Sequence, residues 1–500
     1  MTPDGAPPPR PSAPWSDADL TGLAVCVAGL GVSGPPAARA LARRGARVCV
    51  IDGQRESDAA DADPVAARVH TQAAELRGHG IEVRTGTDAL PAGTELVVTS
   101  PGWRPDAPAL VAANRAGIEV IGDVELAWRL KPAGQRWLAV TATNGKTTTV
   151  RMLEAILRAA GYQARAVGNV GTSIVDVALE PGAENEILAV ELSSFQLHWS
   201  TGVRPEAATV LNVAADHVDW HGDLESYAAD KGRIYASGTT RIVNLDDPWS
   251  RRLADRYGDP TTPTIGFTLA APAIGELGVA DGTLVDRTGA TRDEPGVVLA
   301  SVDDVRPAAP HNVANALAAA AMARVAGVPA AAVRAGLVAF TPEDHRIATV
   351  GTIDGVEYVN DSKATNAHAA AASLAAYDSV VWIAGGLLKG AQEADLDALV
   401  RAARERLRGV VLIGADRARL RAALERTAPD VPVVEIDRTD VNAMDAVIGA
   451  ARDLATTHAA STVLLAPAAA SMDMFTNYGE RGDVFAAAVT RGIDTAATRD

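Results

Sequence analysis

Short apolar runs that end in glycine-rich or polar loops, each followed by a helical stretch, recur from residue 23 almost to the end of the chain. Such runs are typical of strands buried on both faces of a parallel sheet, and the helical stretches supply the crossovers between them. Right-handed crossovers of this kind place helices on the faces of the sheet. The pattern therefore restricts the chain to the α/β class.

The length of the chain and two interruptions of the pattern indicate several domains. Five hundred residues are too many for one ordinary domain. We predict an N-terminal Rossmann-like domain at 21–124, a central P-loop mononucleotide-binding domain at 125–342, and a C-terminal doubly wound Rossmann-like domain at 343–500. Residues 1–20 begin with a Pro- and Ala-rich segment and are predicted to be a disordered tail.

Composition excludes several classes of protein. A net charge of −16 argues against binding to a nucleic-acid backbone. No apolar stretch reaches the roughly 20 residues that a membrane span needs, and the N-terminus lacks the basic and apolar segments of a secretory signal. Cys26 and Cys49 are expected on adjacent strands as buried, reduced thiols. We expect a cytoplasmic monomer that binds neither nucleic acid nor membrane.

The first apolar run ends in a glycine-rich loop, Gly29-Leu30-Gly31-Val32-Ser33-Gly34. A helix to about residue 44 and a second strand that closes on Asp52 are expected to follow. This order is typical of folds that hold a ligand's phosphate at a helix N-terminus. An NAD-dependent oxidoreductase would show the same fingerprint, although that hypothesis explains nothing beyond residue 55.

A second loop of this kind, Thr141–Thr149, lies between an expected strand and an expected helix and reads TATNGKTTT. In such a loop backbone N–H groups cradle phosphates, Lys146 meets the β and γ oxygens, and Thr147 offers its hydroxyl to magnesium. The first glycine of a standard Walker A motif would fall at Val140, so the match is incomplete. A non-catalytic nucleotide-sensing protein would also contain this loop.

Polar side chains follow two further expected strands. Glu191 ends one of them and His217 follows the other, while Lys231 lies on a helical stretch downstream. A carboxylate and an imidazole at the same sheet edge as the phosphate loop indicate a metal site. The alternatives are an N-cap network around Glu191, and for Lys231 an ordinary surface lysine paired with Asp230 or Glu225.

Lysine is scarce in this chain. Its five lysines stand at 131, 146, 231, 363 and 389, and every other basic residue is arginine. A retained lysine is expected where a guanidinium cannot replace a compact ammonium or a reactive amine. Four of the five fall within motifs that were identified independently, which favours functional roles for them.

Taken in order, the motifs GxGxxG, TNGKTT, GNVG, ELSSFQL, NVAADHVD, HNVANA, NDSKATN and PAAASMD resemble those of the Mur ligases of peptidoglycan synthesis. ELSSFQL and DSKATN point to the members that add D-glutamate to UDP-N-acetylmuramoyl-L-alanine. The resemblance implies that ATP phosphorylates the L-alanyl carboxylate and that the amine of D-glutamate attacks the acyl phosphate. A folylpolyglutamate synthase shares the plan and the chemistry, but its pterin-binding signatures are not evident.

The resemblance also implies roles for individual residues. Those implied to contact ATP are Thr143, Asn144, Gly145, Lys146, Thr147, Thr148, Thr149, Asn312, Asn315, Arg346 and Asp361. Those implied to contact the UDP substrate are Ser33, Gly34, Asp52, Asn169, Ser193 and His217. Those implied to bind D-glutamate are Lys363, Thr365, Lys389, Ser471 and Tyr478. Two Mg²⁺ ions are implied, one on Thr147 and Glu191 and one on His217 and a carbamylated Lys231, and the catalytic set is Lys146, Glu191, His217 and Lys231.

Four positions depart from the family's pattern, at Ala142, Leu387, Gly53-Gln54 and Ala348. Ala142 replaces the usual glycine of the phosphate loop and fits only if its φ stays negative. The other departures affect details of the D-glutamate, uracil and ATP contacts, and they leave the implied reaction unchanged.

Overall fold

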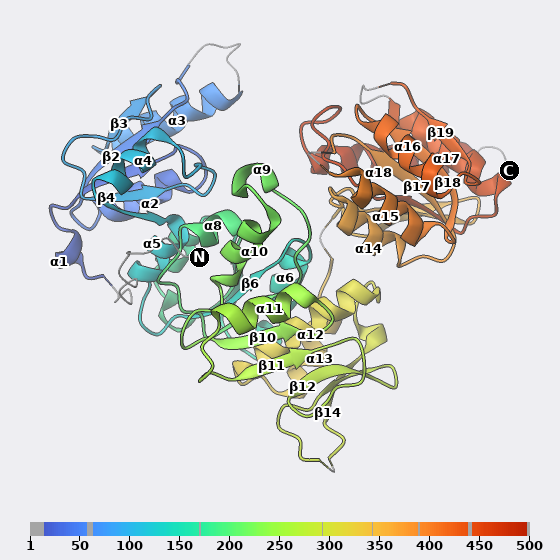
Figure 1. Ribbon diagram of the computed structural model, residues 1–500, viewed down its shortest axis with the longest axis horizontal. Coiled ribbons are helices and arrows are strands. Elements are labelled where there is room, and N and C mark those ends of the chain that lie inside the picture. The colour runs from blue at the N-terminus through green and yellow to red at the C-terminus, as the bar shows by residue number, and fades with distance from the viewer. Residues whose placement is uncertain are drawn as a thin grey trace.

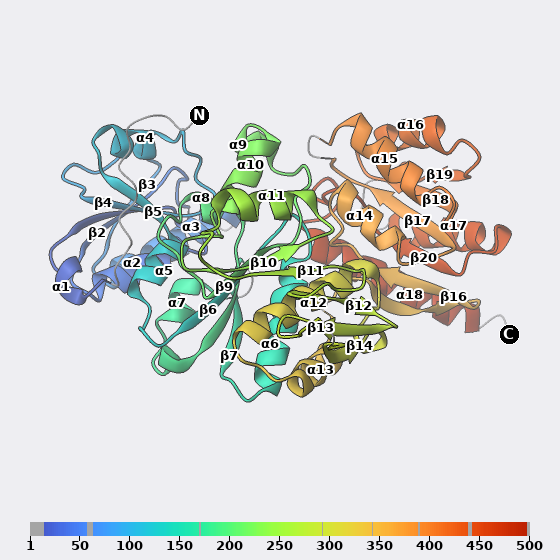
Figure 2. The same cartoon turned by 60° about the horizontal axis from the view of Figure 1, so that its bottom comes forward.

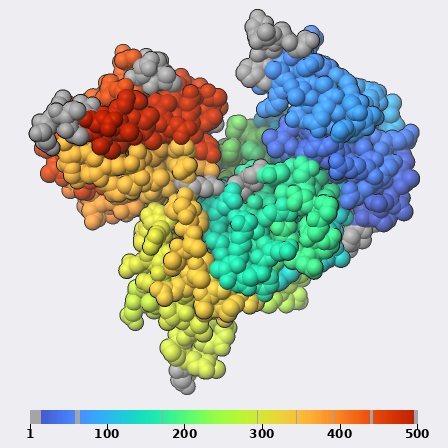
Figure 3. Space-filling view, turned by 180° about the vertical axis from the view of Figure 1, so that it is seen from behind, coloured from blue at the N-terminus to red at the C-terminus, as the bar shows by residue number. Residues whose placement is uncertain are grey.

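The computed structural model describes residues 15–57, 64–169, 172–292, 294–342, 344–388, 391–438 and 443–497. It contains three α/β units in chain order, each built on its own sheet (Figure 1). This confirms the predicted fold class. Seen from behind, the units form three lobes, with the central one between the N-terminal and C-terminal ones (Figure 3). Within the described ranges no helix combines the length and the apolar character that crossing a membrane requires.

The N-terminal unit has a five-stranded parallel sheet in the order β3-β2-β1-β4-β5. The strands are β1 (Ala24–Ala28), β2 (Arg47–Asp52), β3 (Glu82–Thr85), β4 (Leu96–Thr99) and β5 (Glu119–Gly122). The helices are α2 (Gly34–Ala42), α3 (Pro64–Gly78), α4 (Pro108–Arg115) and α5 (Asp123–Leu130). The predicted order of strand, glycine loop, helix and strand is confirmed, whereas β3 was not predicted.

The prediction that residues 1–20 form a disordered tail is wrong for the last residues of that range. Residues 1–14 lie outside the described residues, but Asp17–Leu20 forms the short helix α1. Leu20 is fully buried, and the guanidinium of Arg129 lies 4.7 Å from the ring centre of Trp15. The apolar side chains of Trp15 and Leu20 pack against the core, which accounts for the order of this segment.

The two cysteines occupy matching positions on neighbouring strands. Cys26 of β1 and Cys49 of β2 are partners in the parallel register, both are buried, and neither forms a disulfide. Burial raises the pKa of the Cys26 thiol to about 12. The prediction of buried, reduced thiols on adjacent strands is confirmed.

The central unit has a nine-stranded sheet in the order β14-β13-β12-β11-β10-β9-β6-β8-β7. Its strands are β6 (Arg136–Thr141), β7 (Ala164–Gly168), β8 (Ile187–Glu191), β9 (Ala207–Val210), β10 (Thr240–Asn244), β11 (Thr264–Phe267), β12 (Glu276–Ala280), β13 (Thr283–Asp286) and β14 (Val297–Ser301). Its α-helices are α6 (Lys146–Ala159), α7 (Ile174–Ala178), α8 (Ser194–His198), α9 (Val218–His221), α10 (Leu224–Gly232), α11 (Pro248–Tyr257), α12 (Pro310–Val325) and α13 (Ala330–Ala339). Two short 3₁₀ helices are η1 (Ala183–Asn185) and η2 (Val302–Asp304).

The parallel part of this sheet gathers the polar loops. Strands β9, β6, β8 and β7 are neighbours and run in the same direction, so their carboxyl ends share one edge. The phosphate loop, Glu191, Asn169 and His217 all follow these strands at that edge. Strand β9 ends at Val210, so His217 lies several residues beyond it. Figure 2 shows α9 and α10 together at the upper end of this unit.

The C-terminal unit has a six-stranded sheet in the order β15-β16-β20-β17-β18-β19, in which β15 is antiparallel to β16. The strands are β15 (Ala348–Ile353), β16 (Val356–Asn360), β17 (Val380–Gly385), β18 (Leu407–Ile413), β19 (Val433–Glu435) and β20 (Thr462–Leu465). The helices are α14 (Ala367–Leu374), α15 (Glu393–Ala403), α16 (Arg417–Thr427), α17 (Ala443–Thr457) and α18 (Tyr478–Ala497). Helices α14–α16 pack with one apolar cluster and α17–α18 with another, so the sheet is doubly wound as predicted.

Candidate active site

The phosphate loop turns sharply into α6 at Gly145. Gly145 has a φ of 92°, and a Cβ there would lie 2.5 Å from Oδ1 of Asn315, so only glycine fits. The ammonium of Lys146 donates to the carbonyl oxygens of Ala142 at 2.9 Å and Thr143 at 3.1 Å. Burial lowers the pKa of Lys146, with a smaller contribution from the positive charges of Arg346 and Lys363. The loop therefore holds a preformed cation at a helix N-terminus.

Lys231 reaches the same loop from α10. Its Nζ donates to the carbonyl oxygen of Ala142 at 2.8 Å and lies 4.4 Å from the ring centre of Tyr227. The residue is only 1% exposed. Burial, and then the charge of Lys146, lower the pKa of Lys231 well below its usual value. The alternative of a surface lysine paired with Asp230 or Glu225 is therefore wrong.

Tyr227 is a site residue that sequence reasoning missed. Its hydroxyl lies 3.1 Å from Oγ1 of Thr143, and burial raises the pKa of Tyr227 above its usual value. Tyr227 and Lys231 are four residues apart on α10 and thus share one helix face. This four-residue spacing could have indicated from the sequence that Tyr227 lies beside Lys231.

Glu191 ends β8 with its side chain buried in the site. Glu191 is 2% exposed, and its Oε1 accepts a hydrogen bond from Nδ2 of Asn169 at 3.1 Å. Oε2 is buried and has no hydrogen-bond partner among the described residues. A buried carboxylate oxygen without a donor is costly. This oxygen is therefore suited to a cation.

His217 sits at the start of α9 in a left-handed backbone conformation, with φ of 51°. Its ring centre lies 4.8 Å from that of Phe195, edge to face. Burial lowers the pKa of His217, and the charges of Lys231 and Lys146 lower it further, whereas that of Asp216 opposes them. The imidazole therefore favours its neutral, metal-binding form.

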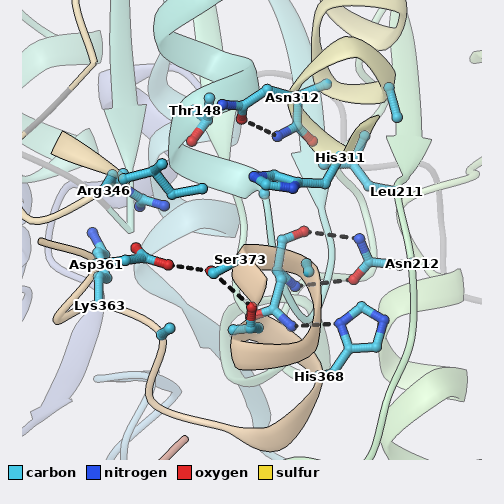
Figure 4. Close-up of a pocket in the computed structure, with 18 of the residues that line it drawn as sticks. Thr148, Leu211, Asn212, His311, Asn312, Arg346, Asp361, Lys363, His368 and Ser373 are labelled. Atoms are coloured by element: carbon cyan, nitrogen blue, oxygen red, sulfur yellow. Dashed lines mark hydrogen bonds between the residues drawn. The ribbon is translucent and has the colours of Figure 1, made fainter. Parts of the chain in front are cut away.

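A cavity of about 270 Å³ lies between the central and C-terminal units (Figure 4). The predicted residues that line it are Asn144, Gly145, Thr148, Asn312, Asn315, Arg346, Asp361 and Lys363. It is also lined by polar residues that sequence reasoning did not identify, among them Asn212, Asn244, His311, His368 and Ser373. The phosphate loop thus opens into a space enclosed by both units, large enough for part of a nucleotide.

Direct hydrogen bonds join the two units across this cavity. Nδ2 of Asn144 lies 3.0 Å from Nδ1 of His368, and the side-chain amides of Asn144 and Asn366 lie 3.4 Å apart. Asn366 caps α14 and His368 follows within its first turn. Asn212 also exchanges hydrogen bonds with the backbone of Asn144, both at 3.0 Å. The sequence could have indicated Asn366 as a helix cap, but its contact with Asn144 depends on how the two units pack together.

Asp361 presents an unusual carboxyl at the cavity wall. Burial raises its pKa to about 6, although a hydrogen bond from Ser373 and the charge of Arg346 oppose the shift. Next along the loop, the ammonium of Lys363 lies 5.1 Å from the ring centre of Tyr478. These two neighbours bring a partly protonated acid and a cation to the same wall.

The residues predicted to bind D-glutamate are only partly assembled in the structure. Lys363 and Tyr478 line one open depression, and Ser471 is buried in the loop after β20. Lys389 lies outside the described residues. Thr365 follows Lys363 in a tight turn, its N–H 2.9 Å from the Lys363 carbonyl. Leu387 forms a β-bridge with Ala470, the residue before Ser471.

The residues predicted to bind the UDP substrate have structural partners of their own. Oδ2 of Asp52 accepts from the Leu30 N–H at 2.7 Å, and Oγ of Ser33 donates to Asp123 at 2.7 Å. Gly34 packs so closely that a Cβ would lie 1.8 Å from the Gly29 oxygen. Ser193 is the N-cap of α8 and forms a capping box with Gln196. An N-cap network was the alternative predicted for the loop after Glu191.

The departures from the family's pattern are accommodated. Ala142 is fully buried and is absent from the residues with a positive φ, so its substitution for glycine is not strained. Ala348 opens β15, and the structure shows no further consequence of it. Leu387 takes part in the bridge described above.

Comparisons with known proteins agree with this geometry. Residues 23–122 match the Mur ligase MurD-like N-terminal domain, and residues 140–323 match the Mur ligase middle domain. The UDP-N-acetylmuramoylalanine–D-glutamate ligase of Thermobifida fusca is 62% identical over 94% of this chain and 98% of its own length. That of Mycolicibacterium smegmatis is 46% identical over 94% and 97%.

Among solved structures, a crystal structure of MurF from Acinetobacter baumannii is similar with a TM-score of 0.58 and 17% identity, covering 95% of this chain and all of that one. At this identity the similarity shows the three-unit fold alone. The sequence matches extend further, because they cover nearly the full length of proteins with one shared activity. They leave no support for the oxidoreductase, nucleotide-sensing or folylpolyglutamate hypotheses. The chain belongs to the UDP-N-acetylmuramoylalanine–D-glutamate ligases of the Mur ligase family.

Proposed function

We propose that the chain is an ATP-dependent ligase that joins D-glutamate to UDP-N-acetylmuramoyl-L-alanine in peptidoglycan precursor synthesis. The observation that carries the proposal is that Lys146 and Lys231 both donate to the same carbonyl oxygen of the phosphate loop. At the same sheet edge, the buried Oε2 of Glu191 has no hydrogen-bond partner among the described residues. Full-length similarity to ligases of this activity supports the same reaction.

The chemistry requires several anions to approach one another. Transfer of the γ-phosphoryl group to the L-alanyl carboxylate places two negative groups in contact, so cations must offset their repulsion. Two carbonyl oxygens of the loop hold the Lys146 ammonium in place, and Arg346 and Lys363 line the adjoining cavity from the C-terminal unit. The amine of D-glutamate then attacks the acyl carbon and phosphate leaves.

The residues present fit magnesium. Within the described ranges no group of three His, Cys, Asp or Glu side chains is arranged to hold a metal ion by itself. The ligands would therefore include Thr147 and Glu191 for one ion, and His217 and Lys231 for the other. The orphaned Glu191 oxygen and the neutral-leaning His217 suit this role. Bound magnesium would neutralise phosphate charge and orient the transferring group.

Lys231 would contribute as a carbamate. Its lowered pKa favours the neutral amine, which can add to CO₂ with loss of one proton and so become an anion. The carbamate nitrogen keeps one hydrogen, which can still donate to the Ala142 carbonyl. Arginine cannot form this group.

The remaining roles follow the predicted sets. Asn312, Asn315 and Asp361 would hold the nucleotide, whereas Lys363, Thr365, Lys389, Ser471 and Tyr478 would receive D-glutamate. Ser33, Gly34, Asp52, Asn169 and Ser193 would contact the UDP substrate. An enzyme of this family is also expected to act in the cytoplasm as a monomer.

ADP release tests the proposal directly. With ATP, Mg²⁺ and UDP-N-acetylmuramoyl-L-alanine, sustained ADP release should require D-glutamate, and L-glutamate should not replace it. Release that is independent of the amino acid would refute the ligase assignment.

A further inference from the structure

A hydrogen-bond network joins three short helices of the central unit, and none of the proposed roles uses it. Oδ2 of Asp230, on α10, lies 2.9 Å from Nδ1 of His198 and 3.0 Å from Nδ1 of His221. Its other oxygen, Oδ1, lies 3.0 Å from Nε of Arg233. Nε2 of His221 lies 3.0 Å from Oγ of Ser194. The network therefore links α8, α9 and α10.

Burial and chemistry fix the direction of these hydrogen bonds. Asp230 is 5% exposed, and the side chain of His221 is fully buried. An ionised carboxylate can only accept, so both imidazoles donate from Nδ1. A neutral His221 then accepts at Nε2 from the Ser194 hydroxyl. Asp230 is thus an acceptor toward three separate donors.

The same histidine also supports the ring of His217. The rings of His221 and Phe195 are stacked, with centres 5.4 Å apart and planes 8° apart. Phe195 in turn contacts His217 edge to face at 4.8 Å and Trp220 at 4.9 Å. The hydrogen-bond network is therefore connected to the His217 imidazole through Phe195.

Each of the three helices follows or carries one residue of the proposed metal site. Glu191 lies just before α8, His217 directly precedes α9, and Lys231 is part of α10. We propose that Asp230 is a positioning residue, which through His198 and His221 fixes the relative placement of these three side chains. The inference rests on the proposed function, and Asp230 itself has no contact with the phosphate loop among its hydrogen bonds.

Asp230→Asn tests this role with little change of volume. Oδ2 of Asp230 accepts from both imidazoles and Oδ1 from Arg233, so the amide must turn its NH₂ group toward one of these sides and lose the hydrogen bonds there. On the other side its neutral oxygen accepts more weakly than a carboxylate does. Loss of such an outer partner typically costs about 10–100-fold in metal affinity or activity. We expect Mn²⁺ binding, measured by electron paramagnetic resonance with a non-hydrolysable ATP analogue, to weaken by that factor. The KM for D-glutamate should stay unchanged, because its predicted site lies in the C-terminal unit.

Glu225→Gln is the matched control. Glu225 is exposed on the same helix and pairs with Arg252 and Arg256, away from the network. It should leave Mn²⁺ binding and turnover unchanged. If Asp230→Asn binds Mn²⁺ and turns over as the wild type does, the positioning role is overturned, even if the melting temperature falls.

A second variant keeps the test decisive if Asp230→Asn does not fold. His221→Phe preserves the stack on Phe195 but removes the hydrogen bonds to Asp230 and Ser194. It too should weaken Mn²⁺ binding, and wild-type binding would overturn the inference. Failure of the proposed function is distinguishable, since the wild-type protein would then release no ADP in response to D-glutamate.

Discussion

The chain contains two units of strand, glycine loop and helix, and their surroundings carry opposite charges. At the first loop the Asp52 carboxylate accepts from the Leu30 N–H, and Ser33 donates to the buried carboxyl of Asp123. At the second, the side-chain nitrogens of Lys146 and Lys231 both donate to one backbone oxygen. The loops share a backbone plan, but acids occupy one and bases the other.

This difference indicates what each loop can bind. A triphosphate carries several negative charges and is stabilised by ammonium groups and a helix N-terminus. A loop that already has a carboxylate on its N–H groups is better suited to the hydroxyl and amide groups of a nucleoside. Glycine spacing predicts the loop, whereas the neighbouring side chains decide its ligand.

The largest effect is expected from Lys146→Ala. Loss of one preorganised cation at the transferring phosphoryl group should lower kcat about 10²–10³-fold. The phosphate loop should stay folded, because Lys231 still donates to the Ala142 carbonyl. Steady-state ADP release measures kcat, and Asp52→Ala at the other loop serves as the contrast, with an unchanged KM for ATP. Near-normal turnover of a folded Lys146→Ala protein would contradict the role of this loop.

Lys231→Arg should lower activity about 10²-fold, the upper end of the loss typical of a disturbed metal site, because arginine is a permanent cation and cannot become a carbamate. Lys231→Ala should also lose activity, and acetate should partly restore it by filling the vacated anion site. ADP release with and without acetate is the measurement. Full activity of the arginine variant would end the carbamate hypothesis.

Ser471→Ala and Lys389→Ala should raise the KM for D-glutamate about tenfold or more, since a hydrogen bond to a charged group contributes roughly 1.5–3 kcal/mol. The KM for ATP should change little. Substrate titrations at saturating levels of the other two substrates separate the effects. Equal changes for ATP and D-glutamate would argue against this pocket.

Asp52→Asn should raise the KM for the UDP substrate several-fold, up to about tenfold, through a weakened contact with the Leu30 N–H. ATP kinetics should be unaffected, which would separate the two loops by ligand. Calorimetry adds a check, because the first loop should bind UDP-N-acetylmuramoyl-L-alanine and not NAD. Tight binding of NAD would reverse the assignment.

The last prediction concerns stability instead of catalysis, namely its dependence on pH. Asp361 has a folded pKa of about 6, raised by burial above its unfolded value. Its protonated form therefore favours folding at low pH, and that contribution, roughly 2–3 kcal/mol at most, is lost as pH rises from about 4 to 6. Asp361→Asn should flatten the free energy of unfolding over this range. An identical slope in urea titrations of both proteins would contradict the shift.

The sequence was sufficient to predict most of the fold, and its failures share a cause. The strands β3, β7 and β15, which do not form the apolar runs from which strands were predicted, each lie at the edge of a sheet. Edge strands are solvated on one side and carry polar residues, as in the Glu-Val-Arg-Thr of β3, so they lack the continuous apolar run of a central strand. The central strands have that run and were predicted with small errors at their ends.

The candidate site was predictable where its residues lie at the carboxyl ends of buried strands. Lys146 and Thr147 follow β6, Glu191 ends β8, and the order of the strands brings them together. Tyr227 and His368 were missed because their contacts with the phosphate loop depend on how α10 and the C-terminal unit pack. Local spacing describes a helix face, but it does not say what that face will touch.

The carbonyl of Ala142 has a consequence for how this loop can vary. It accepts from Lys146 and Lys231 at 2.9 and 2.8 Å, so two side chains depend on one main-chain atom. A main-chain oxygen is present whatever residue occupies the position, so mutation cannot delete it. Position 142 can therefore accept other residues, provided that their side chains are small, because Ala142 is fully buried. Lys146 and Lys231 act through their side chains, so they cannot be replaced in this way. Natural variation should therefore be more frequent at position 142 than at positions 146 and 231.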